Sequence, residues 1–366
     1  MPFKTRPTST HLIEKIKSLQ SDLKSIRMCY ESTYLGFDLC RNIRKEGIDC
    51  EIVATSLIPR SPGDKIKTDR IDSEKLAKYY SQGLLEKIYI PTIEDEADRD
   101  LIRARAHLVD QFKRMKRFII SICKRYSISY RTETSLKDYF TTKHMNWLVS
   151  KIKTLENMSL KINLETLLSS YNQLETTISF YDLKIKELSL LPKYKEKVDS
   201  LVCYRGLETL SAMTIITELG DIKRFVHPKK LCSYLGFDIR ESSSGGKEKK
   251  KNITKMGNHY VRTAIIEANQ YSFMPVKVSR WLTKRRMEIN PKYIEIADRC
   301  MHRQSEKGRR LLARGKIRNK AKVACAREMV GFIWESLIKA TGELLEREKN
   351  TSTMPGHAGP NRGAVC

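Results

Sequence analysis

The sequence lacks any segment close to the roughly 20 consecutive apolar residues that a membrane-spanning helix needs, so we expect no membrane partner. Its first thirty residues are polar and of mixed charge, which is not the pattern of a signal peptide. No Cys-x-x-Cys pair occurs among the nine cysteines, so neither a disulfide framework nor a zinc site is predicted. A reducing cytoplasm is the location that fits this cysteine usage best.

Acidic residues are few relative to basic ones. The 366-residue chain has 69 Lys and Arg against 43 Asp and Glu, a net charge of +26. Residues 240–328 alone hold 24 basic and 8 acidic residues, which is typical of a binding face for a polyanion. Nucleic acid is the commonest such partner. A merely basic soluble protein is the alternative that charge alone leaves open.

Strand and helix patterns alternate in the first quarter of the chain. Short apolar runs predict strands over residues 26–30, 49–58 and 88–90. Helical periodicity predicts helices over residues 11–24, 33–45 and 69–80. This order predicts an α/β domain over residues 1–92.

Two long helical stretches follow. Residues 94–125 contain no helix breaker, and apolar residues from Leu160 to Leu188 recur in alternating steps of four and three. Such a heptad seam predicts a coiled-coil arm over 93–190, packed against a helix of the same chain or of another. A helix buried in an ordinary bundle is the alternative. Further helices predict a mainly α domain over 191–348, and the tail over 349–366 is predicted to be disordered.

Three acidic residues of the first domain are candidate metal ligands. Glu31 follows a predicted strand, and Asp69 and Asp72 share one face of the first turn of a predicted helix. Carboxylates gathered in this way suit Mg²⁺. Two such ions about 4 Å apart can promote phosphodiester cleavage. Interaction with the helix dipole is the alternative role for acidic residues in a first turn.

A glycine turn between two predicted helices is a candidate phosphate contact. Residues 197–203 and 209–219 flank Gly206, as in a helix-hairpin-helix, where backbone N–H groups approach a DNA phosphate. The usual motif has a second glycine where this chain has Glu208, whose carboxylate would repel phosphate. A purely structural turn is therefore the alternative.

The stretch from Glu241 to Lys251 combines serines, two glycines and dense positive charge. One interpretation is a phosphate-approaching loop with a serine nucleophile, and the other is a solvated flexible loop. The only histidine nearby is His259, so a hydrolase triad is not indicated. A second basic segment, residues 309–320, has no aromatics, which suits phosphate tracking rather than base stacking.

Six stretches of the chain form a distinctive series when taken in order. They are CYEST, IDCEIVATSLIPRSPGDKIKTDRIDSEKLA, EDEADRDLIRAR, ITELGDIKRFVHPKKLCSYLGFD, SSGGKEKKKNITKMGNHYVR and LLARGKIRNKAKVACAREMVGFIW. This series resembles the DEDD transposases of the IS-one-ten type of insertion sequence, a family that includes bridge-RNA-guided recombinases. The similarity covers roughly residues 22–345.

The resemblance implies a RuvC-like N-terminal nuclease domain, a coiled-coil arm and a C-terminal transposase domain. It implies four acidic residues that hold Mg²⁺, of which three map onto Glu31, Asp69 and Asp72. It implies a serine that attacks a DNA phosphate and forms a covalent link, and this serine maps onto Ser244, with Ser243 as the second choice.

The implied partners are element-end and target DNA, a structured noncoding guide RNA, and further copies of the chain in a tetramer whose subunits share active sites. Basic residues near the serine and in the second basic segment are the expected nucleic-acid contacts. They are Lys247, Lys249, Lys250, Lys251, Lys255, Arg262, Arg314, Lys316 and Lys320.

One departure from the family pattern concerns the first acidic ligand, which the family places on a strand well upstream of the glutamate. Only thirty residues precede Glu31, and their acidic residues, Glu14 and Asp22, lie in helical patterns. We therefore expect a nuclease domain without its first strands, a metal site one ligand short, and little or no transposition activity. The alternative is an inactive DNA- or RNA-binding relic or repressor that oligomerises through its coiled coil.

Overall fold

The computed structural model describes residues 3, 5–6, 8–33, 35–59, 69–134, 137–244 and 247–352, without the side chains of residues 69–70, 241–251 and 343–352. The chain divides into two compact units, Met1–Thr92 and Ile93–Cys366. Most of the described chain is helical, and its strands form two separate two-stranded sheets. None of the described helices is both long enough and apolar enough to cross a membrane.

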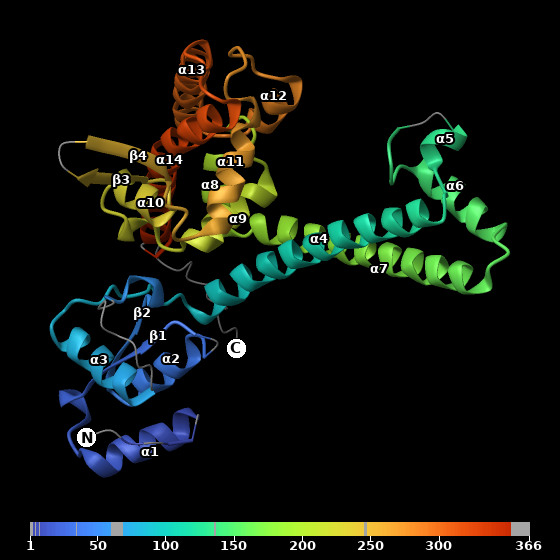
Figure 1. Ribbon diagram of the computed structural model, residues 1–366. Helices are drawn as coiled ribbons and strands as arrows, with labels where there is room; N and C mark the ends of the chain where they lie inside the picture. Colours follow the sequence, from blue (N-terminus) through green and yellow to red (C-terminus); the bar gives the residue numbers. More distant parts are fainter. Residues whose placement is uncertain are drawn as a thin grey trace, which may run out of the picture. The chain divides into compact units, whose positions relative to one another are not determined.

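The first unit contains a β–α–β arrangement with further helices beside it (Figure 1). Its elements are α1 (Ser9–Leu19), β1 (Arg27–Glu31), α2 (Asp38–Lys45), β2 (Asp49–Val53) and α3 (Asp69–Ser81), with short 3₁₀ helices over Leu23–Ser25 and Thr55–Leu57. The two strands are parallel, with Arg27 opposite Asp49 and Glu31 opposite Val53. Because parallel strands need a crossover connection, α2 lies between them in sequence and packs on β2. A small apolar core forms from Ile13 and Ile16 of α1 and the buried residues of α2 and β2.

Two of the strand predictions for this unit were wrong in extent. The strand expected over 49–58 ends at Val53, where the chain turns into a 3₁₀ helix. The strand expected over 88–90 is not formed. An antiparallel bridge joins Val53 to Lys87 just before this segment, and the Ile88 N–H donates to the carbonyl oxygen of Ile52 (2.7 Å). Pro91 follows closely, and a proline has no N–H group to extend the pairing.

The helix expected over 33–45 begins later, at Asp38. A tyrosine on β1 holds the preceding turn, because the Tyr30 hydroxyl donates to the carbonyl oxygen of Gly36 (2.8 Å) and accepts from the Cys40 N–H (3.2 Å). Gly36 has a φ of +61°, in the left-handed region that interrupts a helix.

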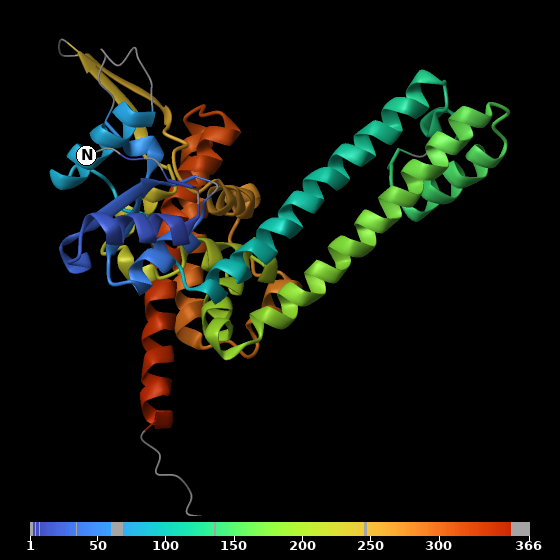
Figure 2. The same ribbon diagram turned by 90° about the horizontal axis from the view of Figure 1, so that it is seen from below.

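A long antiparallel helix pair opens the second unit. Helices α4 (Ile93–Arg125) and α7 (Met158–Ser189) run side by side in both views, with α5 (Tyr130–Thr134) and α6 (Thr142–Lys153) at the far end (Figures 1 and 2). The predicted apolar seam of α7 packs against α4 of the same chain. Its residues Leu160, Leu164, Tyr171, Ile178 and Ile185 are buried, and Leu167, Leu174, Tyr181 and Leu188 are half-buried.

The remaining elements surround one large apolar core. They are α8 (Pro192–Val202), α9 (Thr209–Leu219), α10 (Pro228–Tyr234), β3 (Ile239–Ser244), β4 (Lys247–Ile253), α11 (His259–Ala268), α12 (Arg280–Arg286), α13 (Pro291–Ala313) and α14 (Arg318–Ser352), with 3₁₀ helices over Ile222–Arg224 and Asn269–Tyr271. Ile102 of α4 and Ile185 of α7 belong to this core, so it also holds the near end of the helix pair. The tail predicted over 349–366 begins within α14, and its part beyond Ser352 lies outside the described residues.

Candidate functional site

The predicted metal ligands come from β1 and α3, which pack against each other. Glu31 is the last residue of β1 and is half-buried. Asp69 begins α3, and Asp72, which is half-buried, follows in the same turn. The side chain of Asp69 lies outside the description, and no three metal-binding side chains gather among the described ones. Glu31 and Asp72 offer carboxylate oxygens, the donors that fit a hard divalent cation such as Mg²⁺.

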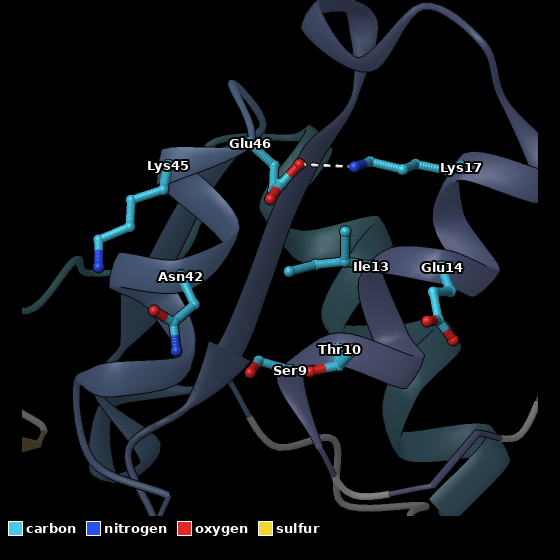
Figure 3. A pocket seen from close by; sticks show the side chains of 8 residues that line it. All are labelled: Ser9, Thr10, Ile13, Glu14, Lys17, Asn42, Lys45 and Glu46. Carbon is cyan, nitrogen blue, oxygen red and sulfur yellow. Dashed lines mark hydrogen bonds and ion pairs between the residues drawn. The ribbon is translucent and has the colours of Figure 1, made fainter.

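A polar hollow of about 480 Å³ lies between α1 and α2 in the same unit (Figure 3). The ion pair between Lys17 and Glu46 crosses it, with a distance of 2.6 Å from Nζ to Oε2. Ile13 lines its floor, and the other lining residues are polar or charged. None of the predicted site residues lines this hollow.

The described residues of the serine-rich stretch form a β-hairpin, so both interpretations were wrong in expecting a loop there. Strands β3 and β4 are antiparallel, and their register places Ser244 opposite Lys247, and Ser242 opposite Lys249. Ser244 is therefore the last residue of β3 and pairs with the first residue of β4. Two glycines between two runs of strand residues are a hairpin signal that the sequence contains and that our interpretation missed.

The base of this hairpin is held by two close backbone contacts. Gly236 and Gly257 have φ values of +70° and +86°. A Cβ at Gly236 would collide with the carbonyl oxygen of Met256, and one at Gly257 would collide with that of Tyr234. Only glycine combines this conformation with this approach. The hairpin therefore leaves the domain from a tightly packed base.

Two predicted nucleic-acid contacts lie at this base. The Arg262 guanidinium donates from Nη1 to the carbonyl oxygens of Leu235 (2.9 Å) and Met256 (3.5 Å), and burial lowers the pKa of Arg262. Arg262 thus stabilises the backbone at the hairpin base. Lys255 is exposed, with a φ of +57°.

A buried carboxylate connects the hairpin base to the helix pair. Glu218 of α9 accepts hydrogen bonds from Arg103 of α4 and from Asn258 Nδ2 (2.6 Å). Asn258 also caps α11, through the N–H of Val261 (3.1 Å). Neither Arg103 nor Glu218 was among the residues predicted from sequence, because no local pattern marks a pair 115 positions apart.

The Gly206 turn has a packing role in this structure. Gly206 has a φ of +88°, and a Cβ there would collide with the backbone carbonyl group of Ala268 at the end of α11. Glu208 pairs with Arg285, at 3.2 Å from Oε1 to Nη1. These contacts account for the glycine and the glutamate without a phosphate, as the structural alternative requires.

The second basic segment joins α13 to α14, and its predicted contacts Arg314, Lys316 and Lys320 are all exposed. The segment itself has no aromatics, but the fold places one beside it. The guanidinium of Arg318 lies 4.5 Å from the ring centroid of Phe273. An aromatic residue from another part of the sequence, Phe273, therefore adjoins this basic segment.

Residues 201–282 match the model of the family described as Transposase IS116/IS110/IS902. The chain is 32% identical over 319 residues to y4qE of Sinorhizobium fredii, provisionally named a transposase, covering 87% of this chain and 77% of the relative. It is 29% identical over 310 residues to the transposase for insertion sequence element IS1533 of Leptospira borgpetersenii, covering 81% and 85%.

A more distant relative is the transposase for insertion sequence element IS1111A of Coxiella burnetii, 23% identical over 58% of this chain and 56% of the relative. The family model covers the segment from the end of α8 into α12, which includes the Gly206 turn and the serine hairpin. Together with the similarity to y4qE over most of both chains, these matches show that the chain belongs to the IS116/IS110/IS902 family of transposases.

Proposed function

We propose that the chain cleaves and joins DNA during the movement of an insertion sequence, with Ser244 as the nucleophile. One observation carries this proposal, namely the position of Ser244 at the end of β3, paired with Lys247 across the hairpin, in a chain of a transposase family. Lys247, Lys249 and Lys251 follow on β4, so the strand that faces the serine is dense in positive charge. Such charge favours the approach of a DNA phosphate.

The reaction has two balanced steps. The Ser244 oxygen forms a bond to phosphorus, the bond from phosphorus to the leaving strand breaks, and that strand's oxygen takes up a proton as the serine hydroxyl loses one. The DNA is then held as a phosphoserine ester. In strand transfer, the hydroxyl group of another DNA end attacks this ester and restores the serine hydroxyl.

Glu31, Asp69 and Asp72 are the residues that would hold Mg²⁺. When bound, the cation would supply charge stabilisation for the phosphate and the leaving oxygen. The first unit would act as a RuvC-like nuclease domain. Support for this assignment comes from the packing of α3 on β1, because it brings the element carrying both aspartates against the strand that ends in Glu31.

The proposed partners follow from the same assignment. The antiparallel pair of α4 and α7 would be a coiled-coil arm that joins copies of the chain in a tetramer. DNA would be the substrate, and a structured noncoding RNA would select the DNA sites. The net charge of +26 supports both nucleic-acid partners.

A covalent-capture assay tests the proposed chemistry. The full chain would be incubated with labelled element-end DNA, the noncoding RNA transcribed beside the element and Mg²⁺, and then denatured to detect protein-linked DNA. We expect an adduct that is lost in Ser244→Ala and in Asp69→Ala, and that needs Mg²⁺.

The matched control is Ser242→Ala, two residues earlier on the same strand, where we expect the adduct to remain. Mass spectrometry of the linked peptide distinguishes Ser244 from Ser243. An adduct that persists in Ser244→Ala and in Ser243→Ala would overturn the serine mechanism. Binding of the DNA with no adduct in the unaltered chain would indicate a DNA-binding protein without this chemistry.

A further inference from the structure

A tryptophan on the short helix α12 is unusually exposed. The Trp281 side chain is 77% exposed, and that of Tyr271, ten positions earlier, is 57% exposed. Met274, which lies between these two aromatic residues in the chain, and Met287, which follows them, are also exposed. Exposed apolar side chains so close together in the chain make this segment a candidate interaction site, because their contact with water is unfavourable.

The segment that carries these residues has charge of one sign. Residues 269–287 contain five Lys and Arg and no Asp or Glu. Residues 307–327 contain nine Lys and Arg and no Asp or Glu. A protein surface normally mixes both signs of charge, so two such segments indicate a polyanionic partner wherever the fold brings them together.

The fold does bring the two segments together. The Lys322 ammonium donates to Oε1 of Gln270 (2.5 Å), and the Ser305 hydroxyl, two residues before the second segment, donates to the carbonyl oxygen of Met274 (2.8 Å). The Arg318 guanidinium stacks on Phe273. The backbone of Gly308 also lies close to Phe273, because a Cβ added at Gly308 would be 3.0 Å from the Phe273 Cβ.

The other end of the aromatic segment is also anchored. The buried Arg286 donates from Nε to the carbonyl oxygen of Cys203 (2.9 Å) and pairs with Asp298 (2.8 Å). With Leu282 buried beneath, α12 is held at its C-terminal end. Trp281 therefore projects from a fixed helix, and little conformational entropy is lost when a ligand stacks on it.

We name this surface the Trp281 face. It consists of the exposed residues Tyr271, Lys277, Arg280, Trp281 and Lys284 and the exposed cation Arg318, which adjoins the same segment at Phe273. Within the described part of the chain, no carboxylate forms an ion pair with Lys277, Arg280 or Lys284. Their charges are thus available to a ligand.

We propose that the Trp281 face binds unpaired nucleotides of a DNA or RNA strand, with a base stacked on Trp281 and phosphates on Lys277, Arg280 and Lys284. A duplex hides the faces of its bases, so an exposed indole gains a stacking partner only where bases are unpaired. This proposal deepens the proposed function, since it assigns to one surface the strand that opened DNA or a folded RNA would present.

Equilibrium binding of short oligonucleotides to the full chain tests the proposal. Fluorescein-labelled 20-nucleotide single strands of DNA and of RNA, and the matching DNA duplex, would be titrated and followed by anisotropy over a range of salt. We expect Trp281→Ala to weaken single-strand binding by about 5- to 100-fold, as the loss of one base–aromatic stack does. Trp281→Phe should retain most of the affinity, and duplex binding should change by less than about twofold.

The salt dependence separates stacking from charge. Lys284→Ala should reduce the slope of log K against log salt for single strands by about 0.7, the value for one phosphate contact, whereas Trp281→Ala should leave it unchanged. The matched control is Phe180→Ala on α7, because Phe180 is also an exposed aromatic at 56%, and we expect no effect on binding. Circular dichroism would check that each variant is folded.

Several outcomes would overturn the proposal. Equal losses of single-strand and duplex affinity in Trp281→Ala would remove the stacking role. Unchanged binding together with a changed oligomeric mass would identify the face as an interface between copies of the chain. The comparison of DNA with RNA identifies the strand that is preferred. Because this assay needs no cleavage, it can succeed where the covalent capture fails, and the two proposals fall independently.

Discussion

The Arg103 guanidinium and the Glu218 carboxylate form a two-pronged ion pair between α4 and α9. Nε donates to Oε1 at 2.5 Å, and Nη2 donates to Oε2 at 2.8 Å. The Glu218 side chain is only 1% exposed, so hydrogen bonds from its partners must replace the hydration that this carboxylate loses on burial. Since Asn258 also donates to it, one buried carboxylate connects the helix pair, α9 and the loop that follows the hairpin.

Replacing this carboxylate should destabilise the second unit. We expect Glu218→Ala to lower the free energy of unfolding by about 2 kcal/mol, because Asn258 and Arg103 lose their acceptor in a buried place. Urea denaturation followed by circular dichroism measures this. Asp110→Ala, which removes the exposed pair with Arg114 on α4, is the control and should cost less than about 0.5 kcal/mol. Equal effects of the two substitutions would contradict a special role for Glu218.

The glycine at the hairpin base should tolerate no side chain. Gly257 and Gly315 both have positive φ, at +86° and +70°, but only Gly257 is in close contact with another backbone segment. We expect Gly315→Ala to cost about 1 kcal/mol, the strain of the left-handed conformation alone. Gly257→Ala should cost at least about 2 kcal/mol more, because the Tyr234 carbonyl group must move. Similar melting temperatures for both variants would show that the base is loosely packed.

The far end of the helix pair depends on aromatic packing. Tyr171 of α7 is buried and stacks on Phe112 of α4, with 4.7 Å between ring centroids. Tyr171→Ala should reduce the stability of this end by about 3 kcal/mol, as large-to-small core substitutions do. Hydrogen exchange of α4 and α7 amides measures the local loss. Leu183→Ala, on the exposed side of the same helix, should leave exchange nearly unchanged, and the reverse result would show that the helices pack through another face.

A buried histidine should make this end sensitive to acid. His144 is 3% exposed, and its Nδ1 accepts from the N–H of Phe140 at 3.2 Å. Burial lowers the pKa of His144 below its usual value. The unfolded chain therefore binds a proton more readily than the folded one, and stability that is complete above about pH 6.5 decreases as the pH falls through that value.

Thermal unfolding from pH 5 to pH 8, with hydrogen exchange to locate the change, measures this dependence. His144→Gln should reduce the loss of stability as the pH falls, because the titrating imidazole is gone. The control is His302→Gln, at an exposed position. A profile for His144→Gln that matches the unaltered chain would contradict the assignment.

The long helices were predictable within a residue or two, because their periodicity is a local property of the chain. The stretch 94–125 matches α4 at Ile93–Arg125, and the seam from Leu160 to Leu188 lies within α7. The short strands were less predictable, since pairing depends on partners elsewhere. The segment 88–90 has strand-forming residues, yet it forms no strand, and the bridge in this region is at Lys87, just before it.

The sequence by itself determined the heptad seam, the concentration of positive charge after residue 240 and the motifs of the family, because each is carried by neighbouring residues. It left open which helix the seam would meet, and it led us to expect a loop where the serine stretch forms paired strands. Only the tertiary structure decided that the seam packs on α4, that Glu218 pairs with Arg103, and that Phe273 adjoins the basic segment between α13 and α14. These contacts join residues far apart in the chain, and no local pattern encodes which distant surfaces meet when a common apolar core is buried.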